Sequence, residues 1–341
     1  MLNYARRLNE TLKPHHSLGI TVLDLFAGCG GLALGFESVG FTTIGFEKDQ
    51  DAVKTYTRNL EGDCYQTELN LSSDYPNAQV IIGGPPCQPF SVGGYQRGIE
   101  DPRNGFPTFL EAVKKIAPKI CLFENVRGLL YTNKWYFEEI LRSLAKLGYV
   151  VEHRLLNAVD YGVPQNRERL FVVAHRGRFT FPRPEAKRCT VTEAIGDLMT
   201  TAPPESKFLT LSMDEYVKKY ELASKCITPR DLHPDKPART LTCRNIAAPT
   251  GDMHRVKLDD GRRRRLLLRE ATRLQSFPDW FEFAGNQTSQ FYQIGNAVPP
   301  LLAQHLANSV KEYFTSSDSI SEQHLMTSPI SINNQLSLFP A

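Results

Sequence analysis

The chain has 341 residues, of which 41% are hydrophobic and 23% are charged, and its formal net charge is +3. This balance argues against a chain that is disordered throughout and against a fibrous repeat. The length predicts one large domain with an insertion, or two domains. No segment approaches the roughly 18 consecutive apolar residues of a membrane helix, and the N-terminal segment lacks the apolar core of a secretion signal. We therefore expect a soluble protein of the cytoplasm that makes no membrane contact.

Cysteine usage and charge narrow the class further. The seven cysteines are scattered along the chain and never form a Cys-x-x-Cys pair. We therefore expect neither a disulfide framework nor a structural zinc site, and we assign no metal. Because the overall charge is nearly neutral, nucleic-acid binding has to be argued from local basic segments.

Short apolar segments rich in β-formers alternate with amphipathic segments from about residue 20 to residue 175. Strands are predicted at 21–27, 42–47, 79–84 and 119–126, helices at 31–40, 51–60, 109–117 and 136–149, and two further apolar segments lie at 150–158 and 169–175. This alternation is typical of βαβ units and predicts an α/β domain with a mostly parallel, helix-covered sheet.

The alternation stops after residue 175. Residues 176–261 are rich in Pro, Lys and Arg, with one predicted short helix at 191–199, and we expect a smaller, irregular domain there. Helical patterning returns at 264–277 and 300–314, and both helices are expected to pack back on the first domain. A polar tail that we expect to be disordered follows. The predicted division is 1–175, 176–261, 262–314 and 315–341.

A glycine-rich turn, DLFAGCGG at 24–31, follows the first predicted strand, and Glu47 ends the second. Glycines permit a sharp turn and close approach of a ligand, and a carboxylate at the second strand end accepts ribose hydroxyls. We expect an adenosine-containing cofactor. Because Gly28, Gly30 and Ala33 satisfy the pattern GxGxxG/A, NAD is an alternative at this point, as is a tight turn without any ligand.

A cysteine-containing loop, IIGGPPCQPFS at 81–91, follows the third predicted strand. Its two prolines stiffen the turn and place Cys87 at the carboxyl end of the sheet, where open α/β folds bind ligands. A free thiol is mostly protonated at neutral pH, so a nucleophilic role requires a local positive potential. Taken alone, Cys87 is more simply explained as a buried structural cysteine.

Three further segments direct polar groups to the same edge. Glu124 and Asn125 end the next strand, QNRER at 165–169 precedes another, and GNAVPP at 295–300 opens the last helix. Each alone has an ordinary explanation: a solvated strand end, surface arginines, or a capped helix start. Together they predict a thiol and a carboxyl group at one sheet edge, with a guanidinium within reach.

The ordered set DLFAGCGGL, GGPPCQPFS, ENV, QNRERLF, REATRLQSFPD and IGNAVPP resembles the motifs of the DNA (cytosine-5) methyltransferases. The resemblance covers about 20–174 and 262–314. It implies a class I S-adenosylmethionine-dependent methyltransferase fold, with a smaller target-recognition domain inserted before the last motifs. It also implies methylation of C5 of cytosine in a specific double-stranded DNA sequence, as the modification enzyme of a restriction-modification system.

The resemblance further implies roles for particular residues. Cys87 would add to C6 of a flipped-out cytosine, Glu124 would contact N3 and the exocyclic amine, and Arg169 would hold O2, with Arg167 in the same catalytic set. The positions that match the S-adenosylmethionine site are Phe26, Gly28, Gly30, Glu47, Glu68, Pro85, Asn296 and Val298.

Two positions depart from the family pattern. Lys48 stands where a bulky apolar residue is common, so the sequence leaves open what covers the adenine. Glu68, followed by Leu69, is the nearest match to the family's Asp-Ile pair, whose acidic residue meets the adenine amino group.

DNA contacts are expected from two segments. Arg97 and Arg103, in the glycine-containing loop after the cysteine motif, are predicted to meet phosphate. Thr240, with Leu241, resembles a Thr-Leu element of the family's recognition regions. Arg244 follows with a side chain that can contact base edges, although ordinary surface residues are an equal alternative.

The predicted helix at 264–277 places Arg265, Arg269 and Arg273 on one face. Such a basic face would suit phosphate binding. Alternatively, Arg269 and Glu270 would organise the domain junction through ion pairs.

The tail contains Gln335, Leu336, Ser337, Leu338 and Phe339, which resemble the short peptide by which bacterial replication proteins bind the sliding clamp. We expect a bacterial, cytoplasmic, nucleoid-associated protein that acts as a monomer. Three alternatives stay open. They are a tRNA cytosine-5 methyltransferase, although its typical Cys-Phe-Thr motif is absent, a non-catalytic DNA-binding module, and a nicotinamide dehydrogenase.

Overall fold

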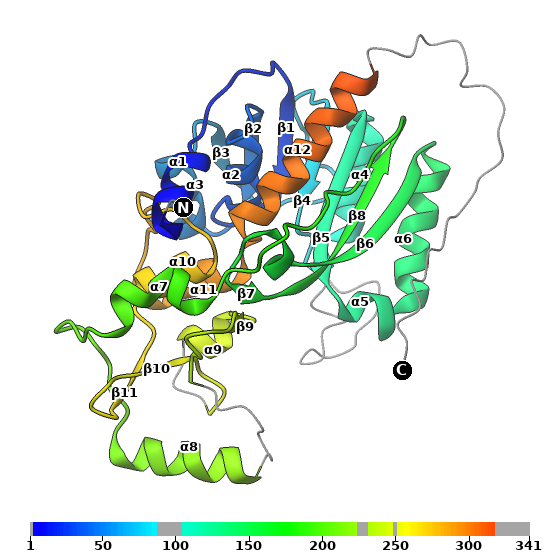
Figure 1. Cartoon of the computed structure of the whole chain (residues 1–341). Coiled ribbons are helices and arrows are strands. Elements are labelled where there is room, and N and C mark those ends of the chain that lie inside the picture. Colours follow the sequence, from blue (N-terminus) through cyan, green and yellow to red (C-terminus); the bar gives the residue numbers. More distant parts are fainter. Residues whose placement is uncertain (1–2, 87–103, 224–230, 248–250, 318–341) are drawn as a thin grey trace.

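The computed structural model describes residues 3–86, 104–223, 231–247 and 251–317. They form an α/β body with a smaller region attached at one end (Figure 1). The central sheet has the strand order β3-β2-β1-β4-β5-β8-β6. Its strands are β1 (Thr21–Leu25), β2 (Thr42–Glu47), β3 (Asp63–Gln66), β4 (Val80–Gly83), β5 (Ile120–Val126), β6 (Val150–Asn157) and β8 (Glu168–His175).

The sheet is parallel from β3 to β5, whereas β8 runs antiparallel to both of its neighbours. The predicted α/β class with a mostly parallel sheet is therefore confirmed. The reversal follows from the short link between β6 and β8, which holds only η2 (Ala158–Tyr161) and β7 (Gln165–Asn166). A parallel crossover needs about a dozen residues or more. As a result, β8 begins beside the end of β5.

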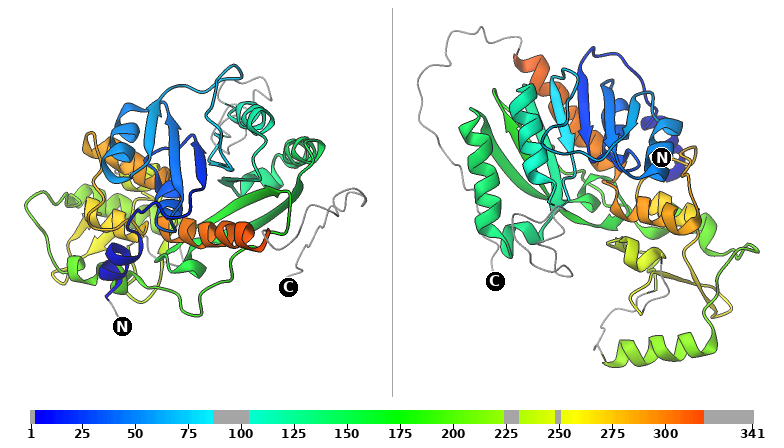
Figure 2. Two further views of the ribbon diagram at one scale, coloured as in Figure 1. Left: turned by 90° about the horizontal axis from the view of Figure 1, so that it is seen from above. Right: turned by 180° about the vertical axis from the view of Figure 1, so that it is seen from behind.

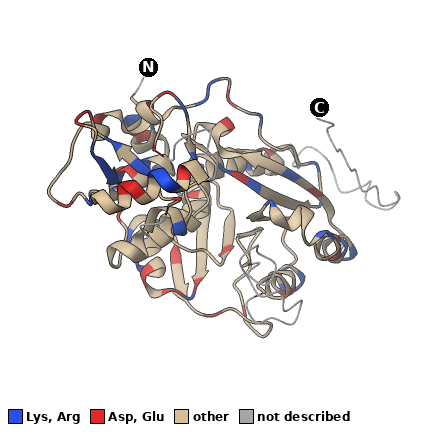
Figure 3. Ribbon diagram, turned by 90° about the horizontal axis from the view of Figure 1, so that it is seen from below, with Lys and Arg blue, Asp and Glu red and all other residues tan. Residues whose placement is uncertain are grey.

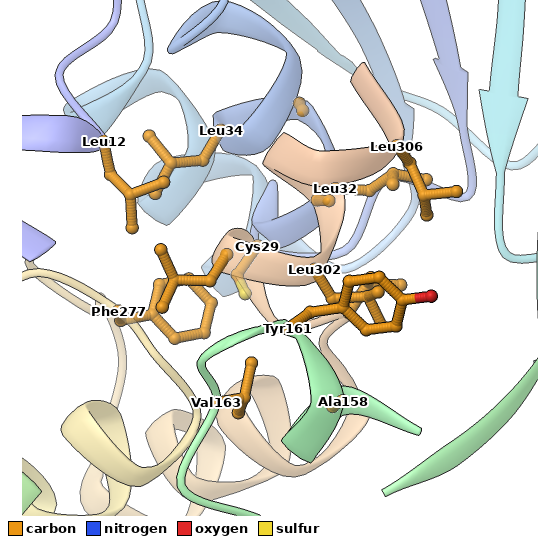
Figure 4. Packing of buried hydrophobic residues seen from close by; sticks show 14 of the residues in the cluster. Leu12, Cys29, Leu32, Leu34, Ala158, Tyr161, Val163, Phe277, Leu302 and Leu306 are labelled. Atoms are coloured by element: carbon orange, nitrogen blue, oxygen red, sulfur yellow. The ribbon is translucent and has the colours of Figure 1, made fainter. Parts of the chain in front are cut away.

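Two hydrophobic clusters lie on opposite faces of the sheet, because side chains alternate along a strand. Val22 of β1 belongs to the first cluster and Leu23 to the second. Helices α2 (Gly31–Glu37), α3 (Gln50–Asn59) and α12 (Pro300–Ser317) contribute to the first cluster, and α4 (Phe106–Ile116) and α6 (Lys134–Lys146) to the second. Figure 2 shows both helical layers, and Figure 4 shows how the first cluster joins segments from both ends of the chain.

The N-terminal helix α1 (Tyr4–Thr11) and the short helix α5 (Gly128–Tyr131) complete the body. Leu8 and Leu12 bury the inner side of the α1 segment in the first cluster. Helix α12 continues to Ser317, past residue 315, so the disordered tail was predicted to begin too early. No helix in the described part of the chain is long and apolar enough to cross a membrane.

The smaller region contains one helix that was predicted from the sequence and a longer one that was not. The predicted helix at 191–199 is present as α7 (Val191–Met199), and its first turn is closed by a capping box between Thr190 and Glu193. Helix α8 (Leu211–Ala223) was not predicted, and it projects away from the body (Figure 1). Its only buried residue is Val217, so the apolar stripe that reveals a surface helix is missing.

Short strands and helices complete the smaller region and return the chain to the body. They are β9 (Ala238–Arg239), α9 (Cys243–Ala247), β10 (Arg255–Lys257), β11 (Arg263–Arg265), α10 (Leu268–Leu274) and α11 (Gln287–Asn296). Strands β10 and β11 pair as an antiparallel hairpin.

The predicted basic helix face is wrong. Helix α10 begins at Leu268, and Arg265 lies in β11. Arg273 is buried and pairs with Asp279 and Asp197. In Figure 3, Lys and Arg positions of this region lie among Asp and Glu positions.

The ion-pair alternative for this segment is correct. Arg269 pairs with Asp279. Glu270 pairs with Arg264 at 2.7 Å, and both of these side chains are fully buried. The hairpin is therefore joined to α10 by a charged contact inside the protein.

Candidate active site

A carboxyl group and a guanidinium meet where β5 ends and β8 begins. Arg169 Nε lies 2.8 Å from Glu124 Oε1, and the side chains are 14% and 13% exposed. The antiparallel register places Val126 opposite Arg169, so Arg169 and Glu124 are diagonal neighbours on one face of the sheet. The structure thus brings together the two charged groups that the sequence placed at this edge.

The segment leading to Cys87 starts beside this pair. Asn125 donates from Nδ2 to the carbonyl oxygen of Pro85 at 2.9 Å. A Cβ on Gly84 would lie 3.8 Å from Glu124 Oε2. The amide of Gly105 donates to the carbonyl of Pro86 at 3.0 Å. Cys87, Arg97 and Arg103 lie outside the described residues.

The glycine-rich turn has the backbone geometry that its sequence indicates. Gly28 and Gly30 have positive φ angles of 55° and 85°, and Phe26, between β1 and the turn, has a φ of 61°. A positive φ is uncommon for a bulky residue and costs free energy, so surrounding contacts hold it. At Gly30, the Tyr56 ring fills the space that a Cβ would need, so this position has no room for a side chain.

Glu47 holds the turn together through its carboxylate. Oε2 accepts from the amide of Gly28 at 2.9 Å, and Oε1 accepts from the amides of Lys48 and Asp49 at 2.8 Å each. The carboxylate therefore sits between the glycine turn and the start of α3, at the end of β2.

Asp24 is a member of this site that the sequence reasoning quoted only as part of the turn. Its side chain is 1% exposed, and Oδ2 has no hydrogen-bond partner among the residues described. Burial, with a further contribution from the charge of Glu47, raises the pKa of Asp24 to about 8. A buried polar atom without a partner is costly, and a ligand donor would relieve that cost. An acidic residue just before a glycine turn was the available signal.

The two positions that depart from the family pattern contact each other. Lys48 Nζ lies 3.2 Å from Glu68 Oε1, and these side chains are 69% and 78% exposed. An exposed pair of this kind contributes little to stability.

The last predicted motif packs on the glycine turn. A Cβ on Gly31 would overlap the carbonyl oxygen of Val298, which leaves no room for a side chain. Val298 is buried and Asn296 is exposed at the end of α11. The contact brings both residues to the end of the sheet that carries the turn.

Of the predicted DNA-contacting residues, Thr240 and Arg244 are described, and Thr240 shares a hollow with Arg169. Thr240 donates from Oγ1 to the carbonyl of Asn166 at 2.6 Å, and Arg244 is exposed on α9. The hollow has a volume of about 530 Å³. It is lined by Val126, Arg127, Asn157, Asn166, Glu168, Arg169 and Thr240.

Arg167 faces the protein interior. It is 1% exposed, and its guanidinium donates to the carbonyls of Leu241, Gly295 and Ala297 at 2.6, 3.1 and 3.1 Å. Burial, with the positive charge of Arg169, lowers its pKa well below its ordinary value. These contacts support a structural task for Arg167 behind the site.

Two further features of the described residues concern metal-ligating groups and the thiol of the glycine turn. These residues contain no group of three or more His, Cys, Asp or Glu side chains that could hold a metal ion. Cys29, within the glycine turn, is buried, and burial raises its pKa to about 12.

Comparison with known proteins decides the family. A family model described as C-5 cytosine-specific DNA methylase matches residues 20–312. The chain belongs to this family. It is 55% identical to the Type II methyltransferase M.AplI of Arthrospira platensis, over 91% of this chain and 91% of that protein. It is 36% identical to M.FnuDI of Fusobacterium nucleatum, over 89% and 97%. This C-5 cytosine DNA methyltransferase is thus of the Type II restriction-modification kind, and the dehydrogenase alternative is wrong.

Solved structures agree with the fold. A putative DNA modification methyltransferase encoded within an E. coli prophage aligns with a TM-score of 0.64 at 24% identity, covering 87% of this chain and all of that one. The Entamoeba histolytica methyltransferase EhMeth aligns with a TM-score of 0.67 at 20% identity, covering 87% and 99%. The C-5 methyltransferase therefore has the class I methyltransferase fold.

Proposed function

We propose that this enzyme transfers the methyl group of S-adenosylmethionine to C5 of cytosine within a specific double-stranded DNA sequence. The observation that carries the proposal is the Glu124–Arg169 pair, which Asn125 ties to Pro85, two residues before Cys87. A thiol, a carboxyl group and a guanidinium are the groups that addition to cytosine requires.

In the proposed reaction, the Cys87 sulfur bonds to C6 of cytosine while Glu124 gives a proton to N3. The electron pair then resides on C5, which is otherwise a poor nucleophile. Arg169 donates to O2 and keeps Glu124 in place. S-adenosylmethionine supplies the electrophilic methyl group. Loss of the C5 proton to a solvent base, return of the N3 proton to Glu124 and release of the Cys87 thiolate restore the aromatic ring.

Addition at C6 requires that the base leave the DNA stack, at a cost of about a few kcal/mol that protein contacts offset. The hollow beside Arg169 is the place that we propose for the extruded base. Its lining mixes one apolar side chain with polar and charged ones, which suits a polar aromatic ring.

The residues around the glycine turn fit S-adenosylmethionine, which carries an ammonium and a sulfonium. Asp24 offers a buried, unpartnered carboxyl oxygen among the described residues, and Glu47 offers a fixed carboxylate for the ribose. The other proposed positions are Phe26, Gly28, Gly30, Glu68, Pro85, Asn296 and Val298.

For the DNA, we propose that Thr240 and Arg244 read bases and that Arg97 and Arg103 meet phosphate. The proposed division keeps 1–175 and 262–314 catalytic and 176–261 DNA-reading. Because β11 pairs with β10, we further propose that the DNA-reading part extends beyond this boundary to residue 265.

We also propose that residues 335–339, which lie outside the described part, dock on the bacterial sliding clamp, and that the enzyme acts as a monomer on DNA in the bacterial cytoplasm. Capture of a bacterial clamp by the intact protein, but not by a variant without 335–339, is the expected result. Equal capture by both would refute the docking.

The test of the main proposal is transfer of a labelled methyl group from S-adenosylmethionine to unmethylated plasmid DNA, with tRNA in parallel. Label that appears in DNA as 5-methylcytosine, and that is lost in Cys87→Ser, is the expected result. Label in tRNA alone would assign the enzyme to the tRNA methyltransferases. Absence of label in both, with the cofactor bound, would leave a non-catalytic binding module.

A further inference from the structure

Two residues of one strand segment hold both backbone groups of Leu241. Gln165 Oε1 accepts from the amide of Leu241 at 2.8 Å, and Arg167 Nη1 donates to its carbonyl at 2.6 Å. Gln165 and Arg167 are two positions apart in an extended segment, so their side chains point to the same side. They therefore hold Leu241 through both its backbone amide and its backbone carbonyl.

Backbone pairing holds the same two segments together. Strands β7 and β9 pair in parallel, with Gln165 opposite Ala238 and Asn166 opposite Arg239. Thr240 adds its hydroxyl bond to the Asn166 carbonyl. The segment from Ala238 to Leu241 is therefore attached along its length to the segment that leads into β8.

The alternation of side chains that starts at Gln165 and Arg167 continues to Arg169, which belongs to the Glu124–Arg169 pair. Gln165 and Arg167 are 0% and 1% exposed and hold Leu241, while the next residue in the series, Arg169, holds Glu124. The segment from Ala238 to Leu241, called the recognition segment below, and the charged pair are therefore held by neighbouring residues of one extended segment.

Further buried hydrogen bonds hold the side chains of Gln165 and Arg167 in place. Gln165 Nε2 donates to Gln275 Oε1 at 2.6 Å and to the carbonyl of Leu274 at 3.1 Å. Gln275 in turn donates to the carbonyl of Ala297 at 2.7 Å, which also accepts from Arg167. In such a buried network each group orients the next, so the loss of one amide loosens the others.

We propose that Gln165 and Arg167 are positioning residues that determine sequence discrimination, because they fix Thr240 and Arg244 relative to the Glu124–Arg169 pair. This inference rests on the proposed function. Direct reading of base edges needs side chains held within hydrogen-bond geometry, and one wrong base pair normally costs about 1–3 kcal/mol. A loosened recognition segment accommodates the wrong base, while the reacting groups remain intact.

The test uses the full-length enzyme and plasmid DNA of known sequence, with methylated cytosines mapped by sequencing. The measured quantity is the initial rate at the recognition site divided by the rate at sites differing by one base pair. Gln165→Met removes the amide and keeps the length of the side chain. Arg167→Lys keeps the buried charge but not the forked contact with three carbonyls.

A matched control is available in the same molecule. Gln293 is also buried, and its amide bonds Thr55, Ala284 and Ser289, which are remote in sequence from the recognition segment. Gln293→Met therefore removes a comparable set of hydrogen bonds. Thermal unfolding of each variant fixes an assay temperature at which all are folded.

We expect the ratio to fall about tenfold or more in Gln165→Met and to a smaller extent in Arg167→Lys, and to be retained in Gln293→Met. Affinity for S-adenosylmethionine stays within twofold of wild type. An unchanged ratio in both variants, or an equal fall in Gln293→Met, would overturn the inference. If Gln165→Met does not fold, Arg167→Lys decides. Wild-type enzyme without methyl transfer to DNA would instead refute the proposed function.

Discussion

Arg169 and Glu124 form an ion pair across two antiparallel strands, with Arg169 Nε 2.8 Å from Glu124 Oε1. The contact depends on the direction of β8, because only an antiparallel β8 begins where β5 ends. The pair is nearly buried, so its geometry is set by the sheet register rather than by flexible side chains. We propose that this carboxyl group exchanges a proton with the cytosine placed beside it.

Replacement of Glu124 by Gln keeps the shape of the side chain and removes its ability to transfer a proton. We expect kcat for DNA methylation to fall about 10²–10⁴-fold, with DNA binding little changed. Single-turnover methyl transfer and a gel-shift assay measure the two quantities. Glu139→Gln, at an exposed position of α6, is the control. A kcat within twofold of wild type would exclude Glu124 from the chemistry.

The composition of this site was more predictable than its geometry. The ends of the predicted strands indicated that Glu124 and Cys87 share an edge, because parallel strands bring their carboxyl ends together. The QNRER segment precedes its strand, so it reaches the same edge only if that strand runs antiparallel. The direction of β8 was not predictable from the same pattern, since the apolar content of a strand is the same in both directions. The length of its connection was the better guide.

The carboxylate of Glu47 organises the proposed cofactor site. Glu47→Gln leaves one oxygen where two accept from three backbone amides, and hydrogen bonds to a charged acceptor contribute about 1.5–3 kcal/mol. We expect the Kd for S-adenosylmethionine to rise about tenfold or more in a calorimetric titration. Lys48→Ala removes only an exposed ion pair and is expected to change the Kd less than about fivefold. The reverse order of effects would place the cofactor against Lys48 instead.

The buried pair of Arg264 and Glu270 joins the β10–β11 hairpin to α10. Glu270→Ala leaves a buried guanidinium without its partner, and the free energy of unfolding is expected to fall by about 3–5 kcal/mol. The double change Arg264→Met with Glu270→Leu removes both charges and is expected to recover most of the loss. Urea unfolding measures both. A loss below about 1 kcal/mol in the single variant would contradict the buried pair.

This pair also explains why the helix at 264–277 was predicted to begin too early. The run from Arg262 to Leu268 has good helix formers, yet three of its arginines are used in the hairpin. Helix α8 was missed for the related reason that its partners are distant in sequence. Arg263 pairs with Asp214, and Arg255 pairs with Glu221. Local periodicity does not report contacts made by charged groups far along the chain.

Glu185 joins the N-terminal helix to α12, since it accepts from both Arg7 and His305. The hydrogen bond from His305, and then that from Arg7, lower the pKa of Glu185 to about 2. A carboxyl group with a depressed pKa stabilises the fold above its ordinary pKa and loses this effect as the pH falls towards 2.

Glu185→Gln is therefore expected to unfold more easily than wild type at pH 7, by about 1–2 kcal/mol after allowance for solvent screening. The difference should shrink as the pH falls from about 5 to 2. Thermal or urea unfolding of both proteins across this range measures it. A difference independent of pH would show that the carboxylate charge is not the cause.

Gly295 has consequences for anyone who wishes to give this enzyme a new target site. A Cβ at Gly295 would overlap the backbone nitrogen of Cys243, directly after the segment held by Gln165 and Arg167. The chain from Ala238 to Cys243 thus lies between two parts of the body. Gln165 and Arg167 hold it on one side, and Gly295 on the other side leaves no room for a larger residue. If the proposed DNA-reading region is exchanged for another, the junctions have to lie outside residues 238–243. The enzyme's own residues then continue to fill this space.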